Sequence, residues 1–135
     1  MATTKELKRA QRSELEQQAV ILDLKSLVQD IDRCEQTIVV LQAELKGVNG
    51  KYPAQRTTRQ DIAYLTDLLK CANKKLAWEK QIAGAQKRTP AVLERMSVLM
   101  NDPVNPPSDA VRAAMLLTLQ GLQSAMDRLQ NVKAN

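Results

Sequence analysis

An unbroken heptad of apolar residues constrains what this chain can fold into more than any other feature of its sequence. Its steps alternate between four and three residues through Val20, Leu24, Leu27, Ile31, Cys34, Ile38, Leu41, Leu45 and Val48. This spacing places every member on one seam of an α-helix, at alternating d and a positions. Such a seam must be buried against another helix, so the sequence predicts helix association and indicates no chemistry of its own.

The composition favours helices over sheets. Apolar residues make up 44% of the 135 residues, yet aromatic residues make up only 2% and there is no Phe. Cores built from Leu, Ile, Val, Met and Ala suit helical bundles, whereas strands are enriched in aromatic and β-branched residues. We therefore expect an all-α chain, in which a long antiparallel coiled-coil hairpin is followed by a shorter two-helix unit.

The chain divides into three predicted parts. Residues 1–19 form a basic, solvated helical arm, whose few apolar residues lie among Lys5, Lys8, Arg9 and Arg12. The arm opens a helix that we expect over residues 3–47, capped by Thr3 with Glu6 three places on. Residues 20–86 form the hairpin, and residues 87–135 form a C-terminal unit of helix, Pro-rich corner and helix.

The hairpin turns through residues 47–53, which hold two Gly, an Asn and a Pro. A second helix begins at Thr57 or the next residue and should meet the first through a second seam, Ile62, Leu65, Leu69, Ala72 and Leu76. A turn centred near Tyr52 places Cys34 level with Cys71. We expect these two sulfurs to lie close in height without bonding; the alternative is a disulfide or a metal pair, although two Cys without His make an incomplete zinc site.

The C-terminal unit starts with a predicted helix break. The basic link 86–88 is followed by Thr89 and Pro90, which are typical of an N-cap and a first helical position. Residues 101–107 hold three of the five prolines and cannot be helical. Ser108 then caps a last helix that runs nearly to the end of the sequence.

The first helix is apolar on more sides than a two-stranded coil requires. Ile21 and Val28 occupy e positions, and Val39 and Val40 lie on outer positions. They predict a further layer, supplied by the C-terminal helices or by another copy of the chain. We interpret them as self-association residues together with Trp78, since a single Trp is typical of a packing or interface anchor. The alternative for Trp78 is stacking on a base.

The positive charge is concentrated in one segment. Residues 70–88 contain six basic residues and one acidic residue, Glu79, so this segment alone carries a charge of +5, which equals the formal net charge of the whole chain. Its basic residues are Lys70, Lys74, Lys75, Lys80, Lys87 and Arg88. Together with the arm they form a candidate nucleic-acid surface, which would neutralise a few phosphates with little sequence readout. The alternative is a solvated lysine face that only keeps the protein soluble.

Residues for acid–base or nucleophilic catalysis at neutral pH are scarce. The chain has no His, its two Cys fall in helix interiors, and no Gly-rich turn offers a phosphate cradle. We expect no catalytic residue, no metal site and no cofactor. The sequence shows neither an 18-residue apolar run nor a segment typical of a signal peptide, so we expect a cytoplasmic protein without a membrane partner.

Two segments carry a family resemblance. Residues 61–80 have a Leu-rich amphipathic opening, then Ala-Asn-Lys-Lys-Leu and a charged continuation; residues 93–114 read helix, Asp-Pro-x-x-Pro-Pro-Ser, helix. The first is similar to the second hairpin helix of the terminase small subunits of tailed bacteriophages, and the second resembles a unit of phage packaging-associated proteins. The resemblance implies a non-enzymatic ring of helical hairpins that recognises viral DNA and hands it to a separate ATPase and nuclease subunit. No helix-turn-helix is evident near the N-terminus, so only the basic residues can be offered as DNA contacts.

The sequence supports two hypotheses about function. The first is a non-catalytic, self-associating helical protein that binds DNA through the basic residues, as in viral DNA packaging, in the host cytoplasm if it is viral. The alternative is a protein-binding adaptor, chaperone or structural coiled coil with no nucleic-acid role, whose apolar e positions meet a different subunit.

Overall fold

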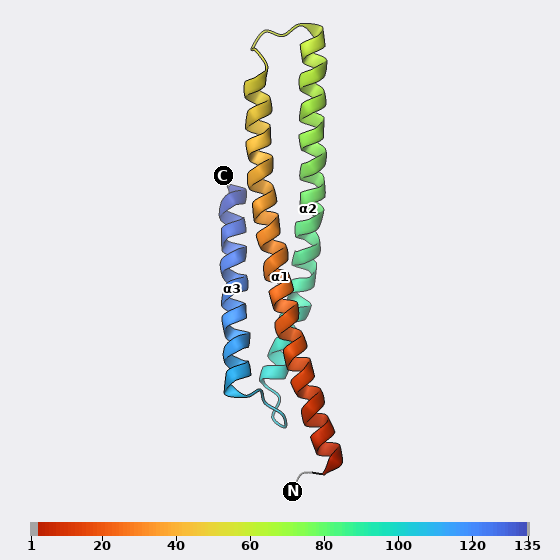
Figure 1. Cartoon of the computed structure of the whole chain (residues 1–135), viewed down its shortest axis with the longest axis vertical. Helices are drawn as coiled ribbons and strands as arrows, with labels where there is room; N and C mark the ends of the chain where they lie inside the picture. Colours follow the sequence, from red (N-terminus) through yellow and green to blue (C-terminus); the bar gives the residue numbers. More distant parts are fainter. Residues whose placement is uncertain (1–2, 135) are drawn as a thin grey trace.

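The computed structural model describes residues 3–134 and is all-α, as predicted. Between residues 3 and 134 three helices follow one another: α1, Thr4–Lys51; α2, Thr58–Met100; and α3, Asp109–Ala134. α1 and α2 form a long antiparallel hairpin, and α3 returns beside α1 but ends well short of the hairpin tip (Figure 1). Residues 1, 2 and 135, which the predicted arm and C-terminal unit include, lie outside the described residues.

α1 begins where predicted and ends later. The Thr3 hydroxyl accepts a hydrogen bond from the Glu6 amide at 3.1 Å, and the Glu6 carboxylate accepts one from the Thr3 amide at 3.2 Å. The predicted end at Gly47 is wrong, because the helix continues through Gly47 and Gly50 to Lys51. The next residue precedes a proline and has an extended backbone, which ends the helix.

α2 begins with the second predicted capping box, in which Thr57 and Gln60 exchange hydrogen bonds of 3.0 and 3.2 Å. The helix break predicted around Pro90 is wrong. α2 continues through Gly84 and Pro90 as far as Met100, so the expected short helix after the basic link is the last part of α2. The fold therefore has one helix where the sequence predicted two.

The environment of Pro90 explains why the helix continues. Pro90 lacks an N–H and frees the carbonyl of Gln86, but both residues lie on the exposed side of α2, where water can bond that carbonyl. The Thr89 hydroxyl donates a hydrogen bond to the Ala85 carbonyl at 2.8 Å inside the core, instead of capping a new helix. α2 bends in this part, as helices do at an internal proline. Beyond the bend it passes behind α1 (Figure 1).

The Pro-rich segment that follows α2 reverses the chain, as predicted. The Asp102 carboxylate accepts hydrogen bonds from the amides two and three residues on, at 2.9 and 3.2 Å. The Ser108 hydroxyl accepts one from the Val111 amide at 3.2 Å and so caps α3.

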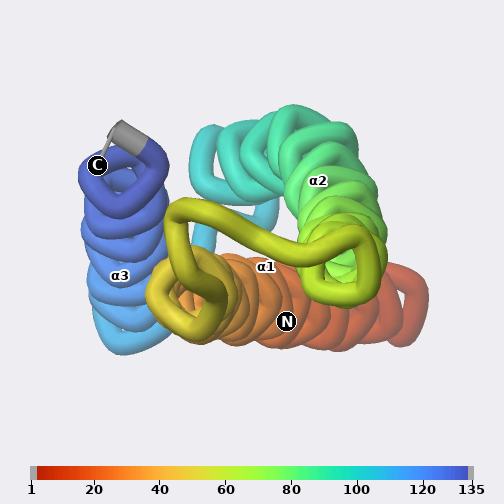
Figure 2. The backbone as a smooth tube through the Cα atoms, turned by 90° about the horizontal axis from the view of Figure 1, so that it is seen from above, coloured from red at the N-terminus to blue at the C-terminus, as the bar shows by residue number. Residues whose placement is uncertain are grey.

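The core lies along the predicted seam of α1. From Val20 to Leu41 its members are at most 8% exposed. The Gln42 amide donates to the Val132 carbonyl at 3.3 Å, so α3 ends at about the height of Gln42. Below this height three helices share the core, whereas α1 and α2 stand alone above it (Figures 1 and 2). The other helices contribute Trp78, Ile82, Ala85, Val92, Met96, Met115, Leu122, Ala125 and Leu129.

The seam predicted on α2 is wrong. Its four large members are 56–63% exposed: Ile62, Leu65, Leu69 and Leu76. A different heptad faces α1, formed by Tyr64, Leu68, Cys71, Lys75, Trp78, Ile82, Ala85, Thr89, Val92 and Met96. This heptad is longer and buries the bulky Trp78, so it removes more apolar surface from water along α1. We call the exposed set, Ile62, Leu65, Leu69, Ala72 and Leu76, the outer stripe.

The register of the hairpin also differs from the expected one. The Trp78 indole donates a hydrogen bond to the Cys34 carbonyl at 2.7 Å, so Trp78 rather than Cys71 lies level with Cys34. The reason is the greater length of α1, which moves the turn from Tyr52 towards Thr57. Cys71 lies seven residues before Trp78, roughly 10 Å along the helix. Both cysteines are free thiols, as predicted.

Candidate nucleic-acid interface

The first turns of α1 form an arm that no other described segment covers. Leu7 and Leu15 on this arm are 54% and 72% exposed. From residue 3 onwards, the first buried residue is Gln17, whose side-chain amide donates to the carbonyl of Asn105 in the Pro-rich corner at 3.2 Å. The arm therefore projects beyond the section where three helices pack (Figure 1).

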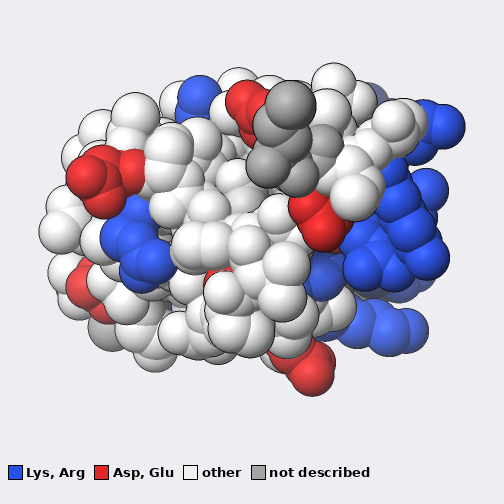
Figure 3. All heavy atoms as spheres, turned by 90° about the horizontal axis from the view of Figure 1, so that it is seen from below, with Lys and Arg blue, Asp and Glu red and all other residues white. Residues whose placement is uncertain are grey.

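Four basic residues share one face of this arm. Lys5, Lys8, Arg9 and Arg12 are separated by three and four residues, the spacing that aligns side chains on a helix. All four are exposed, and none of them makes an ion pair with another residue between 3 and 134. Seen from the end of the molecule at which the arm lies, Lys and Arg side chains gather on one side (Figure 3). One acid, Glu6, lies between the first and the last of them.

The predicted basic residues of α2 do not come together as one patch. Lys74 pairs with Glu44 of α1 at 3.0 Å, and Arg88 pairs with Asp30 of α1. Lys75 lines a groove between α1 and α2 on the other side of the hairpin from Lys74. The remaining three are exposed and make no ion pair within the described part of the chain: Lys70, Lys80 and Lys87.

The structure places the predicted self-association residues in two environments. Trp78 and Ile21 are 4% and 5% exposed, and Val28 packs against the core. The chain itself therefore covers these three, and the indole of Trp78 cannot stack on a base. Val39 and Val40 are about half exposed on the outer side of α1. α2 and α3 supply the predicted further layer for Ile21 and Val28, and α1 covers Trp78, whereas Val39 and Val40 stay exposed.

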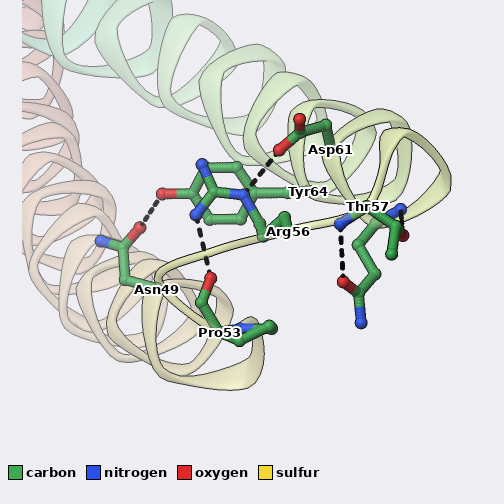
Figure 4. Close-up of polar contacts among 7 residues, drawn as sticks. Asn49, Pro53, Arg56, Thr57, Asp61 and Tyr64 are labelled. Atoms are coloured by element: carbon green, nitrogen blue, oxygen red, sulfur yellow. Dashed lines mark hydrogen bonds and ion pairs between the residues drawn. The ribbon is translucent and has the colours of Figure 1, made fainter.

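The hairpin tip is closed by polar contacts around a tyrosine (Figure 4). The Tyr64 hydroxyl donates to the Asn49 side chain at 2.7 Å, and the Arg56 guanidinium lies 4.5 Å from the centre of the Tyr64 ring. The same guanidinium donates to the Asp61 carboxylate at 2.7 Å and to the Pro53 carbonyl at 3.2 Å. Arg56 thus holds the loop between α1 and α2, and its charge is neutralised there.

A second contact at the tip shifts two pKa values. The Tyr52 hydroxyl donates to the Asp67 carboxylate at 2.6 Å. This hydrogen bond lowers the pKa of Asp67, with the nearby Lys51 and Lys70 as smaller contributors, and it raises the pKa of Tyr52. Because the folded pKa of Asp67 is depressed, its contribution to stability is present above the unfolded pKa and is lost as the pH falls through the folded value.

The Tyr52 contact predicts a pH-dependent mutational effect. We expect Tyr52→Phe to destabilise the protein at pH 7 and to do so less as the pH falls below about 4, the ordinary pKa of an aspartate in an unfolded chain, towards the lower pKa that Asp67 has in the folded protein. Urea unfolding of both proteins from pH 3 to pH 8 measures the difference between their free energies. A difference that stays constant over this range contradicts the assignment.

The described residues bring no acid–base constellation together. Asp30 and Asp32 pair with different helices, Asp30 with Arg88 of α2 and Asp32 with Arg128 of α3. Burial raises the pKa of the Cys34 thiol, which keeps it protonated at neutral pH. Between residues 3 and 134, no three His, Cys, Asp or Glu residues cluster as metal ligands would, and no helix is long and apolar enough to cross a membrane.

The sequence interpretation missed a groove beside the outer stripe. It has a volume of about 660 Å³ and lies between α1 and α2 near the end of α3. Leu45 and Leu68 line it, with Ala72 shared between groove and stripe. The sequence contains the pattern that predicts an uncovered surface here, since α2 carries two apolar heptads and only one of them can face α1.

Comparisons of the chain with protein families, with curated proteins and with solved structures found no match.

Proposed function

We propose that this chain is a non-catalytic, self-associating helical protein that binds nucleic acid through basic helix surfaces, first of all through the arm. The observation that carries the proposal is the single face formed by Lys5, Lys8, Arg9 and Arg12. These side chains are exposed and free of ion pairs within the described residues, so phosphate contact costs them no existing interaction.

The face suits a phosphate backbone better than base edges. Four cations over roughly 10 Å of helix match the close spacing of phosphates along a duplex, and long flexible side chains can follow them. Arg9 and Arg12 add bidentate phosphate contacts, which Lys cannot make. Binding through such a face is tight at low salt and nearly independent of sequence. Lys70, Lys80 and Lys87 of α2 add to it, whereas Lys74 and Arg88 first have to leave their acidic partners.

The similarity of residues 61–80 and 93–114 to phage proteins supports viral DNA packaging as the setting. In that setting the chain acts as terminase small subunits do, in the host cytoplasm, as a helical hairpin that assembles with further copies on DNA and serves a separate enzyme subunit. The uncovered outer stripe, Val39 and Val40 supply apolar surface for such assembly.

A second candidate function is that of a protein-binding adaptor, chaperone or structural coiled coil. The outer stripe favours it, because an apolar helix face of this length suits the helix-in-groove and coiled-coil modes of protein recognition. In this case the lysines only keep the protein soluble and play no part in recognition.

Duplex DNA of random sequence tests the first function against the second. With a fluorescently labelled duplex and the full chain, we expect the affinity to fall about a hundredfold between 50 and 200 mM salt, as four phosphate contacts imply. Fluorescence anisotropy at several salt concentrations gives the slope. Undetectable binding at 50 mM salt, or an affinity indifferent to salt, contradicts the first function and leaves the second.

A further inference from the structure

The outer stripe is a coiled-coil seam without a partner helix. Its five residues are spaced by three, four, three and four positions, so they form one straight seam roughly 21 Å long on α2. It lies about one third of a turn away from the heptad that packs on α1, and its four large side chains are more than half exposed. Proteins rarely leave a continuous apolar seam of this length uncovered.

We propose that two copies of this chain pair through their outer stripes, with their α2 helices antiparallel. This pairing rests on the proposed self-association and specifies the surface and the orientation that produce it. Because each copy offers the same stripe, the contact is a closed two-fold interface.

The antiparallel arrangement gives complementary layers. When Leu65 of one copy lies opposite Leu69 of the second, Ala72 lies opposite Ile62, and both layers recur on the other side of the two-fold axis. The small Ala72 side chain therefore receives a large one, as close packing requires. Leu68 flanks the seam and meets its own counterpart near the axis.

The charges beside the stripe select this orientation. Asp61 and Lys75 both occupy g positions of the stripe heptad, and Lys80 occupies an e position. Antiparallel helices bring g positions together, so the Asp61 carboxylate of each copy, which also accepts a hydrogen bond from Arg56 of its own chain, meets Lys75 of the other at both ends of the seam. Parallel helices bring g next to e, which places Lys75 against Lys80 of the second copy. The first arrangement gains two ion pairs, and the second suffers two repulsions.

The stripe supplies part of the area of a standard interface and is accessible. The four large side chains offer on the order of 400 Å² of apolar surface per copy, about half of what a standard interface needs. The groove of about 660 Å³ adjoins the stripe at Ala72 and supplies further surface. α3 does not obstruct the approach, because it ends near Gln42, and the pair formed by Glu44 and Lys74 places nearly all of the stripe above that height.

Sedimentation equilibrium of the full chain and its variants tests the proposal. We expect the wild type to self-associate and Leu69→Glu to weaken the association at least a hundredfold, since each copy then places a carboxylate in the centre of the seam. Val98→Glu is the matched control, because Val98 is 65% exposed on α2 outside the stripe, and we expect no change. Circular dichroism confirms that each variant is folded.

A charge reversal tests the orientation. Lys75→Asp is expected to weaken association about tenfold, because two carboxylates then meet at each end of the seam, and Lys75→Gln is expected to weaken it less. Stronger association of Lys75→Asp overturns the antiparallel orientation, since the new Asp would then pair with Lys80. A wild type that associates but is indifferent to Leu69→Glu overturns the pairing and leaves the proposed function in place. A wild type that is monomeric up to about 100 µM overturns the self-association itself, which the DNA measurement does not test.

Discussion

Trp78→Ala is expected to lower the free energy of unfolding by about 3–5 kcal/mol, the largest effect that we expect from a single substitution in this fold. Trp78 is 4% exposed and lies in the seam where α2 meets α1, so its removal leaves a large cavity between the two helices. The variant also loses the hydrogen bond from the indole to the Cys34 carbonyl. Urea denaturation followed by circular dichroism at 222 nm measures the change without relying on the single Trp.

Two further variants separate packing from hydrogen bonding at this site. Trp78→Phe keeps most of the apolar contact and loses the indole donor, so we expect an intermediate loss that includes about 1 kcal/mol for the hydrogen bond. Leu22→Ala, at a position 65% exposed on the outer face of α1, should change the stability by no more than about 0.5 kcal/mol. If Trp78→Ala is as mild as Leu22→Ala, Trp78 does not anchor the hairpin.

The parts of the fold that the sequence predicted well are those set by local chemistry. The two capping boxes at Thr3 and Thr57 and the Ser108 cap depend on residues three places apart, and all are present. The seam of α1 was also predictable, because one unbroken heptad left no competing face. The local sequence alone determines structures of this kind, independently of how the rest of the chain folds.

The wrong predictions concern segments whose local sequence fits two different structures equally well. α2 carries two heptads, and the choice between them depends on how much surface each buries along all of α1, which a short window cannot show. Pro90 after Thr89 reads as a helix start, yet the tertiary packing of Thr89 and Val92 keeps α2 continuous. The hairpin register then followed from the true end of α1, so one misplaced boundary displaced every cross-helix pair.

The basic residues of the candidate site could be predicted from the sequence, but the ion pairs that they form could not. Counting charges identified both the arm and the lysine-rich half of α2. Whether a given cation is free depends on the register, because only the folded hairpin brings Glu44 to Lys74 and Asp30 to Arg88. The structure thus makes the arm the stronger of the two candidate surfaces.

The largest effect on nucleic-acid binding is expected from neutralising the arm. The variant with Gln at all four positions should lose at least a hundredfold in DNA affinity at 50 mM salt and reduce the salt slope by about 3.6, because four phosphate contacts disappear. The substituted residues are Lys5, Lys8, Arg9 and Arg12. Gln has nearly the helix propensity of Lys and Arg, and these positions are exposed, so the helix content should not change. Fluorescence anisotropy with a labelled duplex measures both quantities.

A variant with the same loss of charge elsewhere shows whether position or net charge decides. A variant with Gln at four other exposed lysines loses four charges and keeps the arm intact. The substituted lysines are Lys46, Lys70, Lys80 and Lys87. We expect at most a tenfold loss of affinity from it, because these side chains lie apart on two helices and cannot contact one run of phosphates together. Equal losses in both variants mean that only the net charge attracts DNA, and an arm variant that binds like the wild type removes the arm from the interface.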